Sequence, residues 1–259
     1  MSARDLHRSV RPSPIFLAIV TVTAFGGVLA WLDGAQLGAL ARAAVFIFVI
    51  AGWVVSLCLH EFSHAFTAWR FGDRGVAVRG YLDLDPRRYS NPWLSLGIPI
   101  LITVLGGIGL PGAAVYLRTS SMTSAQRTVV SLAGPSANLL LAVLLLGLTT
   151  SFVDPAHPVF WAGVAFLGFL QITALLLNLL PLPGLDGYNA LEPHLSPETQ
   201  RALEQFKPYG IIFLVFLLFV PQVGQWFFGV VYWFFELSGV SGTLAQIGGE
   251  LTRFWTGRF

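Results

Sequence analysis

Long apolar runs separated by short polar stretches dominate this 259-residue chain. A helix needs about 20 apolar residues to cross the hydrocarbon core of a bilayer. Four runs are close to that length or longer, and two shorter ones follow: Ile15–Leu32, Leu40–Trp69, Arg127–Ser151, Val159–Leu180, Tyr209–Val220 and Trp226–Leu237. The segment from Pro221 to Gly224 separates the last two, which suits a helical hairpin. The pattern predicts an all-α polytopic membrane protein with about six transmembrane helices.

A further apolar stretch, Leu94–Val115, differs from the others in composition. It contains prolines and several glycines, among them Pro99, Gly106 and Gly107, and these disfavour a straight spanning helix. Irregular backbone is tolerated at membrane depth only where protein or a water-filled cavity satisfies its hydrogen bonds. We therefore expect a re-entrant loop or β-strand here, between the second and third spans.

The composition agrees with a lipid environment. Hydrophobic residues make up 55% of the chain and charged residues 11%, against about 25% charged in an ordinary soluble domain. The net charge is only +2 and there is no basic run, so nothing indicates binding to nucleic acid. The single cysteine, Cys58, excludes an internal disulfide.

The positive charges predict the orientation of the chain. With a cytoplasmic N-terminus and six spans, fourteen of the fifteen Lys and Arg residues fall on the cytoplasmic side and only Arg42 falls outside. Cytoplasmic loops of membrane proteins carry such an excess. The sequence thus predicts a multi-pass protein of the cell membrane with both termini in the cytoplasm. If Leu94–Val115 crossed the bilayer fully, this bias would weaken.

The predicted second span carries the pattern H-E-x-x-H, with His60, Glu61 and His64. Histidines four residues apart lie on one face of a helix and can bind one metal ion together. The glutamate beside the first histidine can serve as a general base toward water at that metal. Ionisable residues inside a membrane helix are costly and therefore indicate a functional site. The alternative is a polar helix end that faces headgroups or a neighbouring helix.

A catalytic zinc site usually takes three protein ligands, so a third is needed. Asp186 is a candidate because it closely follows an apolar helix that ends on the same side of the membrane as the histidines. Two prolines that cannot continue the helix and two glycines that permit turns surround it: Pro181, Pro183, Gly184 and Gly187. An ordinary turn aspartate is the alternative, with Glu192 or Glu204 as the third ligand.

Two asparagines lie within the predicted helices near these candidates. Asn178 either bonds a carbonyl freed by Pro181 or holds substrate backbone or a developing oxyanion. Asn138 lies among the small residues Gly134, Ser136 and Ala137, and we expect it to serve helix packing.

These segments resemble the site-2 protease family of intramembrane zinc metalloproteases. The resemblance rests on His60–His64, on the segment Asn178–Gly187 with its two prolines, and on Ala133–Asn138. It extends from about Leu40 to Leu195. Many members of that family carry a PDZ or CBS domain, and this chain has room for neither.

The resemblance implies hydrolysis of a peptide bond in or beside a transmembrane helix of a membrane-protein substrate. Because H-E-x-x-H lies near the cytoplasmic end of its predicted helix, we expect that bond to lie near the cytoplasmic face. It implies one zinc ion per chain on the positions His60, His64 and Asp186, with Glu61 as general base. Two other interpretations stay open: a membrane zinc protease with a glutamate as third ligand, and a non-catalytic metal-binding or transport protein. The sequence predicts neither the identity of the substrate protein nor the oligomeric state.

The sequence thus predicts four regions along the chain. These are a cytoplasmic tail (1–14), a first transmembrane helix (15–39), a catalytic membrane core (40–195) and a C-terminal helical hairpin with its tail (196–259). Within the core, the resemblance implies a membrane strand in Leu101–Val115 that pairs with unwound substrate. Gly106 and Gly107 are therefore candidate substrate-binding residues.

Overall fold

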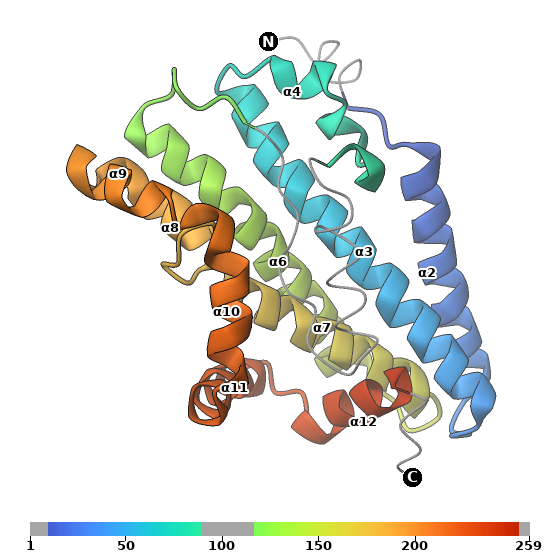
Figure 1. The fold of residues 1–259 in the computed structure, drawn as a ribbon. Coiled ribbons are helices and arrows are strands. Elements are labelled where there is room, and N and C mark those ends of the chain that lie inside the picture. The colour runs from blue at the N-terminus through green and yellow to red at the C-terminus, as the bar shows by residue number, and fades with distance from the viewer. Residues whose placement is uncertain (1–9, 90–116, 254–259) are drawn as a thin grey trace.

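The computed structural model describes residues 10–89 and 117–253, and its regular elements within these ranges are all helices. Four helices are long and apolar enough to cross a membrane: α2 (Pro14–Leu32), α3 (Ala39–Arg70), α6 (Ser124–Phe152) and α7 (Pro158–Asn178). They lie side by side and alternate in direction along the chain (Figure 1). Their bounds agree with the four long apolar runs to within three residues. The prediction of an all-α membrane protein is confirmed for the described residues.

Local sequence determines where three of these helices begin. The Ser13 hydroxyl accepts a hydrogen bond from the first turn of α2, and Pro14 occupies a position where no backbone N–H is needed. At the start of α6, Thr123 and Gln126 form a reciprocal capping box. Pro158 opens α7 in the same way that Pro14 opens α2. These helix starts therefore follow from short-range chemistry.

Helix α3 is the centre of the bundle. It packs against α2, α6 and α7, and α6 also packs against α7. Buried residues make up 56% of the apolar segment of α3 and 72% of that of α7, but 22% of that of α2. The outward faces of α2 and α6 instead expose large apolar side chains: Leu17, Phe25, Leu140 and Val143. The protected interior, where polar side chains can find partners away from lipid, lies between α3, α6 and α7.

Short helical turns follow α3 at one end of the bundle (Figure 1): α4 (Gly75–Val78), η1 (Tyr81–Asp83) and η2 (Pro86–Arg88). Asp73 holds this segment together. Its carboxylate accepts hydrogen bonds from the backbone N–H groups of Gly75 and Arg118 and from the Arg79 guanidinium. The end of α3 is thereby tied to the segment that leads into α6.

After α7 the chain forms shorter helices: α8 (Asp186–Leu191), η4 (Glu192–His194), α9 (Pro197–Glu204), η5 (Lys207–Tyr209), α10 (Gly210–Phe219), α11 (Pro221–Glu236) and α12 (Gly242–Thr252). The Thr128 hydroxyl joins α6 to α8 by donating to the carbonyl of Ala190. Helix α12 was not predicted from the sequence, and it packs against α7 and α3.

The prediction of six transmembrane helices is not confirmed by the described residues. Helix α10 has 10 residues and α11 has 16, so both are shorter than a full crossing. Pro221 to Gly224, expected to separate two spans, form the first turn of α11, because proline is favoured at the first helical position. The predicted re-entrant element Leu94–Val115, with Gly106 and Gly107, lies outside the described residues.

Helices α10 and α12 are attached to opposite ends of the bundle. A Cβ on Gly210, the first residue of α10, would meet the carbonyl oxygen of Pro183 in the loop after α7. Thr150, near the end of α6, donates a hydrogen bond to the carbonyl of Ser238 just before α12. Between Gly210 and Ser238 the chain therefore passes once from one end of the bundle to the other.

The packing of α12 on α7 can be tested at a glycine. A Cβ on Gly248 would meet the carbonyl oxygen of Ala162, which is fixed in the backbone of α7. We expect Gly248→Ala to lower the free energy of unfolding by about 1–3 kcal/mol, the usual cost of overpacking, and thermal unfolding in detergent would measure it. Gly242→Ala, in the same helix, is the control because its Cβ would meet no atom within 4 Å. Equal melting temperatures would contradict this packing.

Candidate metal centre

The second half of α3 brings His60, Glu61 and His64 into the interior of the bundle. Because α3 is continuous from Ala39 to Arg70, residues four apart lie on one face, about one turn apart. The relative exposure is 2% for Glu61 and 5–6% for the two histidines. The two imidazole rings meet edge to face, with centroids 4.8 Å apart. The H-E-x-x-H pattern therefore forms a buried polar cluster, as its spacing predicts.

The backbone after α7 brings Asp186 toward these histidines. Helix α7 ends at Asn178, and Asp186 is the first residue of α8. Gly184 has a positive φ of 97°, a conformation that residues with a side chain rarely adopt. A Cβ on Gly187 would meet the carbonyl oxygen of Leu179, so glycine allows α8 to start directly against the end of α7. The prolines and glycines of this loop thus turn the carboxylate inward, as expected from the sequence.

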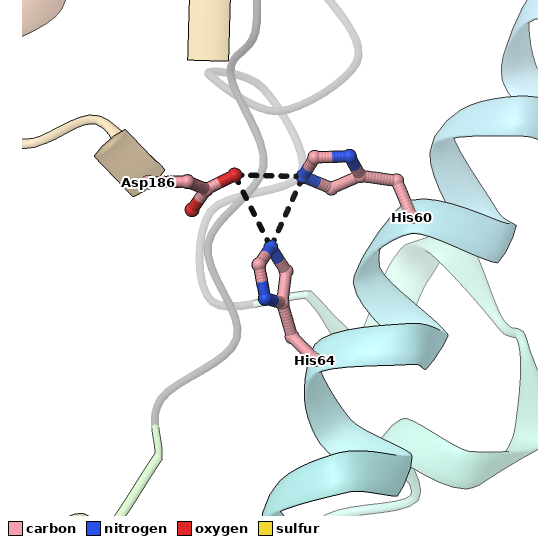
Figure 2. A group of neighbouring side chains, drawn as sticks. All are labelled: His60, His64 and Asp186. Atoms are coloured by element: carbon pink, nitrogen blue, oxygen red, sulfur yellow. Dashed lines mark hydrogen bonds and ion pairs between the residues drawn. The ribbon is translucent and has the colours of Figure 1, made fainter. Parts of the chain in front are cut away.

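Three side-chain atoms from these residues converge (Figure 2). His60 Nε2 and His64 Nε2 are 3.1 Å apart, and Asp186 Oδ2 lies 3.2 Å from the first and 3.3 Å from the second. Ligand atoms about 2.0–2.1 Å from a tetrahedral zinc ion are about 3.3 Å from one another. Two imidazole nitrogens and a carboxylate oxygen are also ligands that zinc accepts. The geometry and the donor set both fit this ion.

The outer nitrogens of both imidazoles are hydrogen-bonded, which decides where their protons lie. His60 Nδ1 is 2.6 Å from Asn138 Oδ1, and His64 Nδ1 is 2.7 Å from the carbonyl oxygen of Val130. Because both partners are acceptors, each Nδ1 donates, and in the neutral imidazole each Nε2 then presents a lone pair. In the described part of the chain, Asp186 Oδ2 is buried without a hydrogen-bond partner. Three lone pairs that face one another repel, and a bound cation relieves that repulsion.

Glu61 lies beside the converging atoms without joining them. Its Oε1 is 3.9 Å from His60 Nε2, which is too long for a hydrogen bond. Together with His64 and Asp186 it lines a cavity of about 320 Å³. A general base needs this arrangement, since it must be close to water at the metal without being a ligand itself.

The same cavity connects the buried carboxylates with more exposed charged side chains. Glu192 lines it and pairs with Lys207 Nζ at 2.6 Å and with Arg127 Nη2 at 3.6 Å. The Lys207 and Arg127 side chains are 32% and 31% exposed, whereas that of Glu61 is 3% exposed. The cavity therefore gives water a route to the metal centre.

The other candidate residues take different positions. Glu192 forms its ion pairs away from the converging atoms, and Glu204 is exposed on α9. Among the described residues, the acidic side chain whose oxygen converges with the nitrogens of both histidines is that of Asp186. Asn178 is buried at the last position of α7, and its proposed function stays a prediction. The same holds for the two glycines of the re-entrant segment, which lie outside the described residues.

Sequence reasoning missed the contact of Asn138 with His60. Packing among small residues was expected, but the structure instead places its amide oxygen against His60. A signal was available, because an amide within an apolar helix needs a buried partner. Gly134 lies one turn earlier on the same face of α6, where a Cβ would meet the Nε2 atoms of both histidines. Helix α6 therefore contributes an amide that contacts the imidazole of His60 and a glycine that leaves room for both imidazoles.

Comparisons with known proteins agree with this site. Residues 46–157 match the model of peptidase family M50. The chain is 64% identical to a protein of Mycolicibacterium smegmatis named a zinc metalloprotease, Rip2, over the full length of both. It is 66% identical over 256 residues to the Rip2 of Mycobacterium tuberculosis H37Rv, which covers 99% of each chain. YwhC of Bacillus subtilis, also named a zinc metalloprotease, is 33% identical over 187 residues, 69% of this chain and 83% of the relative.

No solved structure matches the chain. The apolar helices and the donor set define a membrane-embedded zinc metalloprotease. The chain belongs to peptidase family M50, the site-2 protease family, as its motifs predicted. Because the family match ends at residue 157, Asp186 lies beyond it, and the structure is what brings this residue to the histidines.

The close approach of α6 to the metal centre predicts that Gly134 cannot be replaced. A Cβ there would lie 2.5 Å from His60 Nε2 and would also meet His64 Nε2. We expect Gly134→Ala to displace an imidazole and to weaken zinc binding at least about tenfold, measured by competition with a chromophoric chelator. Gly147→Ala in the same helix should bind zinc like the unaltered protein, because its Cβ would meet no atom within 4 Å. Unchanged zinc affinity in Gly134→Ala would contradict the position of α6.

Proposed function

We propose that this zinc metalloprotease hydrolyses a peptide bond in or next to a transmembrane segment of a membrane-protein substrate, near the cytoplasmic face. The observation behind the proposal is that the ligand atoms converge beside α3, a helix long and apolar enough to span the bilayer. A metal centre within such a bundle acts on bonds at or close to the same depth. The proposed ligands of the single zinc ion are His60, His64 and Asp186.

In the proposed reaction, water adds to the scissile carbonyl and the bond between carbon and nitrogen then breaks. Bound zinc supplies a Lewis acid that polarises the carbonyl and lowers the pKa of water. Glu61 accepts a proton from the attacking water and delivers it to the leaving nitrogen. Asn138 and the carbonyl of Val130 hold the imidazole protons on the outer nitrogens, so that the inner ones stay available for the metal.

A substrate helix hides its peptide bonds in its own hydrogen-bond ladder, so it must be locally extended before it is cleaved. We propose that the segment Leu101–Val115 pairs with the extended substrate as an added strand, with Gly106 and Gly107 allowing close backbone approach. Asn178 is proposed to bind substrate backbone or the developing oxyanion, because its buried amide lies at the end of the helix that precedes Asp186.

For the membrane orientation we propose that the end of the bundle with the metal centre faces the cytoplasm, as the positive charges indicate. The cavity with Arg127 and Lys207 then opens toward cytoplasmic water. The single passage between Gly210 and Ser238 supports five crossings with α12 on the outer side. It does not support the predicted hairpin of two crossings or the predicted cytoplasmic C-terminus. The catalytic core is proposed to be 40–195, which contains all four residues of the centre.

Replacement of the general base separates catalysis from metal binding. We expect Glu61→Gln to keep one zinc per chain and to lower proteolysis at least about 100-fold, since the amide cannot accept the proton. The assay is cleavage, in proteoliposomes, of a single-span substrate with a helix-breaking Asn-Pro pair in its span. Ser63→Ala is the control within the same motif, because the bond of this hydroxyl to described residues is to the carbonyl of Leu59 one turn earlier.

Two results would contradict the proposal. Loss of zinc from Glu61→Gln would make this residue a ligand and the mechanism wrong. Cleavage of a soluble unfolded protein, with the single-span substrate left intact, would contradict proteolysis within the membrane.

Cysteine labelling tests the orientation. Ser120, Ala156 and Gln246 are exposed, and the sole native thiol, Cys58, is fully buried and stays unreactive. With a membrane-impermeant maleimide on intact cells, Ala156→Cys and Gln246→Cys are expected to react, and Ser120→Cys only after permeabilisation. If Gln246→Cys reacted only after permeabilisation, the number of crossings would be even and the proposed five crossings would be wrong. If Ser120→Cys reacted on intact cells and Ala156→Cys only after permeabilisation, the orientation of the protein in the membrane would be opposite to the one proposed.

A further inference from the structure

The hydrogen bonds around His60 continue into the bundle beyond Asn138. Asn138 Nδ2 donates to Gln171 Oε1 at 2.8 Å, and Gln171 Nε2 donates to Ser56 Oγ at 3.0 Å. The Ser56 hydroxyl in turn donates to the carbonyl oxygen of Trp53 at 2.7 Å. Gln171 is fully buried within α7, and Ser56 and Asn138 are 5% and 3% exposed. A chain of polar groups thus links α3, α7 and α6 through an otherwise apolar interior.

The backbone carbonyl at the end of this chain gives it a single direction. A carbonyl only accepts, so the Ser56 proton points to Trp53 and the oxygen of Ser56 accepts from Gln171. The Gln171 oxygen must then face Asn138, whose NH₂ group turns toward it. The remaining atom of Asn138, its Oδ1, faces His60 Nδ1.

The direction matters because a side-chain amide can turn over and exchange its oxygen and nitrogen. If Asn138 turned over, its NH₂ group would face His60 Nδ1, which would become the acceptor. The imidazole proton would then move to Nε2, the nitrogen that faces Asp186 at 3.2 Å. A protonated Nε2 cannot bind a metal ion.

We propose that Gln171 is a positioning residue for the zinc centre, which it serves by fixing the orientation of the Asn138 amide and, through it, the tautomer of His60. Gln171 is linked to His60 through Asn138 and is proposed neither as a metal ligand nor as a substrate-binding residue. The proposal rests on the metal site described under the proposed function, and it assigns a function to a glutamine two turns before the end of α7 and outside every motif of the sequence.

A pair of substitutions in two backgrounds tests this inference. Gln171→Met keeps the length of the side chain but removes both hydrogen bonds, and we expect zinc affinity to fall about tenfold, as for partners of metal-binding histidines. In the Asn138→Asp background, Gln171→Met should lower zinc affinity less than about twofold. Both oxygens of a carboxylate accept, so the tautomer of His60 no longer depends on which way the group is turned. Zinc dissociation constants would come from competition with a chromophoric chelator.

Thr173→Val is the matched control on the same helix. Thr173 is fully buried, but within the described ranges its hydroxyl bonds only the carbonyl of Phe169 one turn earlier, so its loss should leave zinc affinity unchanged. Ser56→Ala removes one oxygen, the one that accepts the hydrogen bond from Gln171. If thermal unfolding shows that Gln171→Met does not fold, Ser56→Ala is used for the test in its place. If Ser56→Ala lowers zinc affinity in the chain that keeps Asn138 but not in the Asn138→Asp background, the inference is supported.

An equal loss of affinity in both backgrounds would show that Gln171 acts by packing alone and would overturn the inference. No loss in either background would overturn it as well. Failure of the proposed function gives a different result. The unaltered protein would then bind no zinc, or His60→Ala would bind it as well as the unaltered protein does.

Discussion

The meeting of one carboxylate oxygen with two imidazole nitrogens inside an apolar helical bundle is the constraint on which the rest of the structure depends. Removing a carboxylate from water costs several kcal/mol unless a cation or hydrogen-bond donors compensate. Among the described residues Asp186 Oδ2 has no hydrogen-bond partner, and two imidazole nitrogens, which carry no proton when Nδ1 holds the proton of a neutral ring, lie within 3.3 Å of it. A divalent cation compensates all three at once. The central position of α3 buries the two histidines, the end of α7 at Asn178 lets Asp186 approach them, and Gly134 of α6 leaves room for both rings.

Much of the fold could be predicted because its causes are local. The four long helices follow from apolar length, and the pairing of His60 with His64 follows from the helical repeat. The position of Asp186 could also be predicted, because prolines and glycines disclose where a helix must end and turn. Helix α12 has no such signal: it is short and glycine-rich, and it is held by contact with α7 that no local pattern encodes.

The remaining differences have physical causes of two kinds. The interval Pro221–Gly224 was ambiguous, since proline both ends one helix and starts the next, and only the position of Ser238 beside Thr150 decides how often the chain passes along the bundle. The contact of Asn138 with His60 joins residues 78 positions apart. A single sequence shows that a buried amide needs a partner, but the packing of α6 on α3 selects which one.

The contacts of Gly184 have a consequence for how this protein can be divided. A Cβ there would lie 2.6 Å from the carbonyl oxygen of Lys207, and Gly210 lies against Pro183 in the same loop. The loop that ends at Asp186 is thus formed partly by residues that come well after it. A fragment that stopped at residue 195 would keep His60, Glu61, His64 and Asp186 yet lose one wall of that loop. The loop that ends at Asp186 and the C-terminal quarter of the chain therefore depend on each other for folding, although the sequence motifs end before that quarter begins.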